Sequence, residues 1–115
     1  MKKSNISVFF PAYNEEENIP WLVSNACNFL DTVADKYEVI VVNDGSRDGT
    51  GEVAEKIAAE NSHVRVIHHP VNRGYGAAVR SGLKGAIYDL IFFTDGDGQF
   101  DITELTEFLN LIDTC

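Results

Sequence analysis

The stretch from Tyr37 to Val42 constrains the fold of this chain more than any other. It reads Tyr-Glu-Val-Ile-Val-Val and ends in four β-branched residues in a row. β-branched side chains favour strands, and an apolar run without polar alternation belongs to a strand that is covered on both faces. Such strands are typical of parallel sheets with helices on each side. We therefore expect an α/β fold.

Strand and helix patterns alternate along the rest of the chain, as the spacing of apolar residues indicates. Pro11 is expected to stop the first strand, and Asn18 to cap the first helix with Pro20 in its first turn. The order βαβαβαβα predicts a three-layer sandwich with a mainly parallel sheet, right-handed crossovers and a single domain over residues 1–115. The expected strands are residues 6–10, 37–42, 64–68 and 90–94, and the expected helices are about residues 19–33, 50–60, 75–87 and 102–112.

The third expected helix has a face of small residues, formed by Ala78, Gly82 and Gly85. This face should let the helix lie close to the sheet. Gly74 and Gly76 do not form a dinucleotide fingerprint, because the sixth position of that pattern is Val79 here. They favour a tight turn into a helix whose N-terminus faces a phosphate or a ribose.

The polar residues that stand out in this chain follow its strands. In a parallel α/β fold, the loops after the strands all lie at the carboxyl edge of the sheet, where ligands bind. The sequence therefore predicts one site at this edge. Its loops carry Tyr13-Asn14-Glu15, Asp44, the stretch from Asn72 to Gly76, and Asp95 with Asp97.

Asp95 and Asp97 come directly after the last apolar run. In extended backbone, residues i and i+2 point to the same face, so both carboxylates can converge on one point. At about 4 Å they would repel by roughly 4 kcal/mol in a protein-like dielectric. A divalent cation such as Mg²⁺ or Mn²⁺ would remove that cost. A polar turn built from Asp and Gly is the alternative, and the other polar loops at the same edge weigh against it.

Composition excludes several classes of protein. The chain has 115 residues and a net charge of −9, which argues against nonspecific nucleic-acid binding. Its two cysteines, Cys27 and Cys115, suggest neither a disulfide framework nor a zinc site. The apolar run after the basic N-terminus is too short for a signal peptide, and no stretch reaches transmembrane length.

Four motifs in order carry a resemblance to a known family. They are residues 8–16 (Val-Phe-Phe-Pro-Ala-Tyr-Asn-Glu-Glu), residues 41–50 (Val-Val-Asn-Asp-Gly-Ser-Arg-Asp-Gly-Thr), residues 72–76 (Asn-Arg-Gly-Tyr-Gly) and residues 95–99 (Asp-Gly-Asp-Gly-Gln). The chain resembles the inverting family 2 glycosyltransferases of GT-A fold over nearly its whole length. Within that family it looks most like the dolichyl-phosphate mannosyltransferases and the bacterial polyprenyl-phosphate glycosyltransferases.

The resemblance implies roles for particular residues toward a UDP- or GDP-linked sugar. Asp44 would contact the base or the ribose. Asp95 and Asp97 would bind a metal that bridges the diphosphate, with the Gln99 amide oxygen as a further ligand. Asn72 and Gly74 would lie at the nucleotide sugar, and the loop after the first strand would hold the base through Pro11, Ala12, Tyr13, Asn14 and Glu15.

The implied chemistry is sugar transfer with inversion, and the metal would offset charge on the departing diphosphate. A lipid-phosphate acceptor would need no general base, whereas a hydroxyl acceptor would need one. In the resembling family that base comes from a later half of the domain. We therefore expect a truncated, nucleotide-binding half in the cytoplasm, at the cytoplasmic face of a membrane if the acceptor is a lipid.

Other interpretations stay open at this point. A non-catalytic nucleotide-binding or interaction module derived from half a glycosyltransferase is one. A Mg²⁺-binding signalling receiver is another, although it needs an acidic pair after the first strand, where this chain has Pro11-Ala12-Tyr13. Glu16 and Glu17 are interpreted as a solvated helix start, and Asp48 as a turn or cap residue. His63, His68 and His69 lack metal-ligand spacing and are interpreted as strand-end and loop residues.

Overall fold

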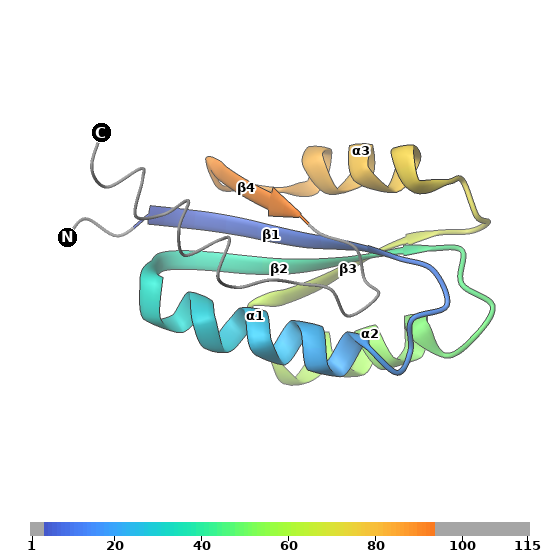
Figure 1. The fold of residues 1–115 in the computed structure, drawn as a ribbon, viewed down its shortest axis with the longest axis horizontal. Helices are drawn as coiled ribbons and strands as arrows, with labels where there is room; N and C mark the ends of the chain where they lie inside the picture. Colours follow the sequence, from blue (N-terminus) through green and yellow to red (C-terminus); the bar gives the residue numbers. More distant parts are fainter. Residues whose placement is uncertain (1–3, 94–115) are drawn as a thin grey trace.

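Four parallel strands form one sheet in the order β3-β2-β1-β4 (Figure 1). The computed structural model describes residues 4–93. The strands are β1 (Ser4–Ala12), β2 (Ala34–Asp44), β3 (Val64–His69) and β4 (Leu90–Phe93). This confirms the expected parallel sheet, with β1 and β2 as its central strands.

Helices cover both faces of the sheet and make three layers (Figure 1). α1 (Ile19–Val33) and α2 (Thr50–Glu60) lie on one face, and α3 (Tyr75–Gly85) lies on the other. α2 has the predicted bounds, whereas α3 ends two residues before the predicted Ile87. The helix predicted over residues 102–112 lies outside the described residues.

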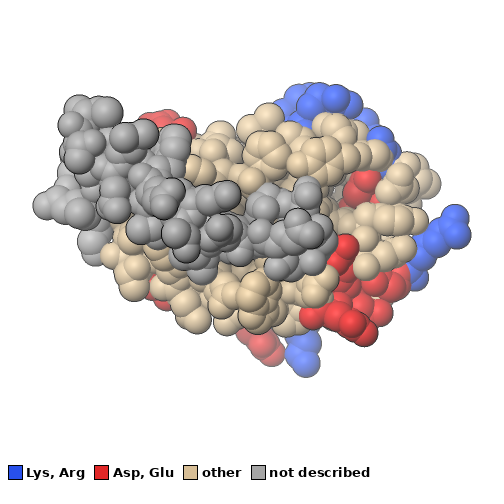
Figure 2. Space-filling view, in the orientation of Figure 1, with Lys and Arg blue, Asp and Glu red and all other residues tan. Residues whose placement is uncertain are grey.

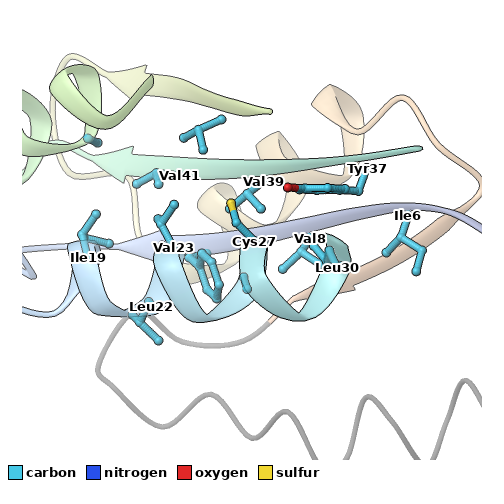
Figure 3. Packing of buried hydrophobic residues seen from close by; sticks show 14 of the residues in the cluster. Ile6, Val8, Ile19, Leu22, Val23, Cys27, Leu30, Tyr37, Val39 and Val41 are labelled. Carbon is cyan, nitrogen blue, oxygen red and sulfur yellow. The ribbon is translucent and has the colours of Figure 1, made fainter. Parts of the chain in front are cut away.

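The side chains of β2 alternate between two cores, as its continuous apolar run predicted. Val39 and Val41 pack toward α1 and α2 (Figure 3), and Ile40 and Val42 pack toward α3. All four are fully buried. Because both faces of β2 are buried here, the strand has apolar residues at every one of these positions and no alternation of polar and apolar residues.

Pro11 does not stop the first strand, and that expectation was wrong. β1 continues through Pro11 to Ala12, and these residues pair with Val42 and Asn43 of β2. Proline lacks an N–H group and is tolerated in a strand where one side is not paired. Among residues 4–93, the pairing of β1 with β4 runs from Ile6 to Phe9 and does not include Pro11.

Asn18 has the predicted position before α1 but not the predicted bonding. Its side chain makes no cap hydrogen bond; its amide instead donates to a Glu15 carboxylate oxygen at 2.7 Å. The Glu15 carbonyl accepts the backbone N–H groups of Asn18 and Ile19. Glu15 therefore organises the start of α1, and Pro20 lies in the first turn as expected.

Glu38, the polar residue of the β2 run, fixes the segment that leads into β4. Its buried carboxylate accepts hydrogen bonds from the Ser7 hydroxyl (2.7 Å), the Arg65 guanidinium (2.7 and 2.9 Å) and the Ile87 N–H (2.8 Å). Arg65 also donates to the Gly85 carbonyl. These bonds end α3 at Gly85 and bring the chain back to the sheet.

The strand order creates a switch point between β1 and β4. From β1 the chain moves outward through β2 and β3, and then returns to the other side of β1 as β4. Loops at such a point diverge to opposite faces, and the crevice between them is where open α/β sheets bind ligands. Within residues 4–93 no helix is long and apolar enough to cross a bilayer.

Candidate functional site

Asn14 joins the loop after β1 to the loop after β2. Its backbone is in the left-handed region, with φ of 55°, where asparagine is tolerated better than most residues. Its N–H donates to the Ser46 hydroxyl at 3.0 Å, and its side-chain oxygen accepts the Arg47 N–H at 2.8 Å. The Glu15 N–H adds a bond to the Thr50 hydroxyl at 2.8 Å. The two loops therefore form one unit.

Asp48 organises the start of α2, in agreement with its interpretation as a turn residue. One of its carboxylate oxygens accepts both the N–H and the hydroxyl of Thr50. Burial alone would raise the pKa of Asp48, but the hydrogen bonds from Thr50 and from the Glu16 N–H outweigh it and lower that pKa. Glu16 and Glu17 are exposed, as expected for a solvated helix start.

Asp44 joins the loop after β2 to the loop after β3. One carboxylate oxygen accepts the Arg73 N–H at 2.9 Å, and the other accepts the Gly74 N–H at 3.0 Å. The Asn72 side-chain amide donates both to this carboxylate and to the Asp44 carbonyl. Only 4% of Asp44 is exposed. In the structure the carboxylate thus holds the turn into α3.

Gly45 lets these same loops touch through their backbones. Its φ is 67°, and a Cβ atom there would lie 2.3 Å from the Asn72 nitrogen. No other residue type fits a left-handed backbone against another backbone at this distance. Gly74, at the start of α3, also has a positive φ of 97°. A Cβ atom there would meet nothing within 4 Å, so at Gly74 the backbone conformation alone favours glycine.

His69 is the residue that sequence reasoning missed. It ends β3, one residue beyond the expected end of that strand at His68, and its ring is buried between Asp44 and Ser81. Nδ1 is 2.7 Å from the Asp44 carboxylate, and Nε2 is 2.8 Å from the Ser81 hydroxyl. The signal that could have found it is the strand register, because Asp44 and His69 are the last residues of β2 and β3 and pair directly.

The structure brings together three of the four predicted loops. Tyr13 is 40% exposed beside the switch point, whereas Pro11 and Ala12 are buried at the end of β1. Contact of these residues with a ligand stays a prediction, as it does for Asn14, Glu15, Asp44, Asn72 and Gly74. Asp95, Asp97 and Gln99 lie outside the described residues. In the strand before them, the last described residue is Phe93, whose ring is stacked on Phe9 of β1 with centroids 5.0 Å apart.

Acidic side chains gather near these loops. Figure 2 shows them at the end of the molecule where α1 and α2 begin, and Glu16 and Glu52 both lie beside Gly49. Among residues 4–93, no group of three or more His, Cys, Asp or Glu residues is placed to hold a metal ion. An anionic ligand at this edge would therefore meet local negative charge unless a cation accompanied it.

The family of the chain follows from its sequence. The family-wide profile described as "Glycosyl transferase family 2" matches residues 7–114. This chain belongs to glycosyltransferase family 2. The parallel sheet with helices on both faces agrees with the fold expected from the resemblance.

Two curated relatives show what this family member is similar to. The human "Dolichyl-phosphate beta-glucosyltransferase" is 38% identical over an alignment of 115 positions that covers 91% of this chain and 36% of the relative. The "Polyprenol monophosphomannose synthase" of Mycolicibacterium smegmatis is 34% identical over an alignment of 110 positions that covers 92% of this chain and 40% of the relative. The chain spans about a third of the length of the curated relatives that it matches.

Solved structures of glycosyltransferases share the fold. S. aureus TarS 1-349 in complex with UDP-GlcNAc is 30% identical, with a TM-score of 0.76, over 96% of this chain and 31% of that one. The mannosyltransferase PcManGT from Pyrobaculum calidifontis, in complex with GDP-Man and Mn²⁺, is 27% identical, with a TM-score of 0.74, over 84% of this chain and 28% of that one.

The family 2 chain does not have the strand order of a signalling receiver. Receivers of the CheY type have the order 2-1-3-4-5, in which the third strand lies next to the first. Here β4 is the neighbour of β1, and β3 is two strands away. The receiver interpretation is therefore excluded.

Proposed function

We propose that this chain binds a nucleoside diphosphate sugar, UDP- or GDP-linked, at the carboxyl edge of its sheet. The observation that carries the proposal is the joining of the loops after β1, β2 and β3 at the carboxyl edge of the sheet. Asn14 joins the first two loops, and Asp44 joins the second to the third. A ligand crevice works best when its walls are already in place before binding. The complexes of similar structures with UDP-GlcNAc and GDP-Man support the proposal.

The described loops suggest where each part of the donor would lie. The loop from Pro11 to Glu15 would hold the base, with the exposed ring of Tyr13 as a contact surface. The start of α3, after Asn72 and Gly74, would face the diphosphate or the ribose, because helix N-termini attract anions. The first turn of α3 itself contains no acidic side chain. The Asp44 carboxylate already occupies the Arg73 and Gly74 N–H groups just before this turn, so the ligand would meet the N–H groups that follow.

A divalent cation, Mg²⁺ or Mn²⁺, would be held by Asp95, Asp97 and Gln99. Two carboxylates and an amide oxygen are the hard ligands that these ions prefer. When bound, the cation supplies charge compensation for a departing diphosphate. The net charge of −9 makes such compensation necessary for an anionic donor. The Mn²⁺ in the PcManGT complex supports this proposal.

The transfer itself would place the sugar on a polyprenyl or dolichyl phosphate, as the names of the relatives suggest. An acceptor phosphate is already anionic and needs no general base. The reaction would then occur at a membrane surface, which we propose to be the cytoplasmic face. A non-catalytic binding module is the alternative, and it predicts partner binding that does not depend on the cation.

Isothermal titration calorimetry of the 115-residue chain tests the donor site. UDP, GDP and their sugars are titrated with Mn²⁺ and again with EDTA, on the wild type and on Asp97→Ala. We expect one nucleotide to bind with Mn²⁺, and its affinity to fall at least about tenfold with EDTA or in the variant, which corresponds to one lost charge-assisted contact.

Asp89→Ala is the matched control. Asp89 is exposed and comes directly before β4, whereas Asp97 comes after β4 in the sequence. Removal of the Asp89 carboxylate should therefore leave nucleotide binding unchanged. Equal binding with Mn²⁺ and with EDTA would contradict the cation site. Absence of binding for every nucleotide would contradict the donor site in this chain.

A further inference from the structure

His69 is a buried, polar group that the proposed donor chemistry does not use. It lies at the end of β3, directly paired with Asp44 at the end of β2. The side chains of His69 and Asp44 are only 4% and 5% exposed. A buried imidazole and a buried carboxylate are costly unless they bind each other or other partners, and here both are fully engaged.

Two contacts fix the imidazole. An ionised carboxylate only accepts hydrogen bonds, so Nδ1 of His69 carries the proton in its 2.7 Å contact with Asp44. In the neutral ring, Nε2 then accepts the Ser81 hydroxyl at 2.8 Å. Because Ser81 belongs to α3, the ring connects that helix to the end of β2.

We propose that His69 is a positioning residue of this site, which holds the Asp44 carboxylate in the orientation that binds the Arg73 and Gly74 N–H groups. These are the N–H groups of the turn into α3. The chain of contacts runs from Ser81 through His69 and Asp44 to that turn. The effect of His69 on ligand affinity rests on the proposed donor site. The effect of His69 on the turn into α3 does not depend on that proposal.

The order Asp44, His69, Ser81 resembles a nucleophilic triad, but the surroundings exclude that role for Ser81. Ser81 lies inside α3, between the helix ends at Tyr75 and Gly85. N–H groups within a helix are bonded to carbonyls one turn earlier, so they cannot stabilise an oxyanion beside the hydroxyl. The geometry therefore supports positioning.

Amide hydrogen exchange in the ligand-free chain, followed by NMR, tests the effect of His69 on the turn. In His69→Ala we expect the Arg73 and Gly74 amides to exchange at least about tenfold faster than in the wild type, since a hydrogen bond to a charged group is weakened. His69→Asn keeps a donor close to the Nδ1 position and should restore most of the protection. Rates in His69→Ala equal to those of the wild type would overturn the proposal.

His63→Ala is the matched control, because His63 lies at the opposite end of β3 and contacts Tyr37. It should leave the exchange rates of the Arg73 and Gly74 amides unchanged.

If His69→Ala does not fold, the variants His69→Asn and Ser81→Ala test the proposal instead. Ser81→Ala removes the hydroxyl that binds Nε2 of His69 and should raise the exchange rates of both amides by about threefold. Unchanged rates in Ser81→Ala would then overturn the proposal.

Titration of UDP and GDP with Mn²⁺ into the same variants links the turn to binding. We expect His69→Ala to bind the preferred nucleotide at least about tenfold more weakly, with His69→Asn in between. Equal affinity of His69→Ala and the wild type would overturn the role of His69 in the site. If the wild type binds neither nucleotide, the proposed function fails, and amide exchange still decides the role of His69.

Discussion

At the scale of single residues, the ionisation of Asp44 makes the stability of the fold depend on pH. Burial alone would raise the pKa of its carboxyl group, but hydrogen bonds from His69, Arg73 and Gly74 outweigh that effect and hold the pKa below its ordinary value. The pKa is therefore lower in the folded state than in the unfolded chain. The stabilisation by the ionised carboxylate is complete at pH values above the pKa of the unfolded chain, about 3.9. It is lost as the pH falls through the lower pKa of the folded state.

We expect Asp44→Asn to lower the free energy of unfolding by about 2 kcal/mol at pH 7, because buried N–H groups lose an ionised acceptor. The difference from the wild type should narrow as the pH falls below about 4. Urea unfolding followed by circular dichroism at pH 7, 5 and 3 measures it. Asp89→Asn, at an exposed position, should differ little at any pH. A gap of the same size at pH 3 and pH 7 would count against the ionised contact.

The same residues show how far the sequence can predict the site. Asp44, Asn72 and Gly74 were identified because they follow strands, and the structure does bring them together. Their contacts with one another were not predictable, because the partners of Asp44 lie 28 to 30 residues away. His69 was interpreted as a strand-end residue, since nothing in its local sequence distinguishes a buried ring from an exposed one.

At the scale of elements, the packing of α3 on β1 depends on Gly82. A Cβ atom there would lie 2.2 Å from the ring of Phe9. Phe9 is fully buried and stacked on Phe93, so it has little room to move. Alanine favours a helix by about 1 kcal/mol over glycine, but overpacking of a core costs about 1–3 kcal/mol. We expect Gly82→Ala to be destabilised by about 1–2 kcal/mol in urea unfolding.

Gly76→Ala, on the same helix, is the control for helix propensity. A Cβ atom at Gly76 would meet only the Arg80 guanidinium, at an ordinary contact distance of 3.6 Å. This variant should be as stable as the wild type or more stable by up to about 1 kcal/mol. If Gly82→Ala were stabilised to the same degree, α3 would not lie against Phe9 as the structure shows.

Element types were predictable where the apolar pattern was long, as in β2, α2 and the small-residue face of α3. Boundaries were less so, because long-range pairing sets them. β2 begins at Ala34, directly after α1, because the start of the strand pairs with Ser4 and Asn5 of β1. The continuation of β1 through Pro11 depends in the same way on the pairing of Pro11 and Ala12 with Val42 and Asn43 of β2. Neither fact is present in a local pattern.

At the scale of the whole molecule, the described elements should differ in their resistance to opening. β1 and β2 occupy the middle of the sheet and are covered by helices on both faces (Figure 1). Buried backbone amides exchange with solvent only through opening of the elements that cover them. Val39 to Val42, fully buried, should therefore require nearly global unfolding.

We expect the amides of Val39 to Val42 to exchange at least about tenfold more slowly than those of β3 and β4 in native-state hydrogen exchange. The predicted difference in exchange rates bears on function. Asn14 follows the carboxyl end of β1, and Asp44 is the last residue of β2. The proposed donor site would then stand on the most stable part of the fold, which keeps its loops in place before a ligand arrives. If β4 exchanged as slowly as β2, the outer edge of β4 would have to be covered as well, and Asn14 and Asp44 would not stand on the most stable part of the fold.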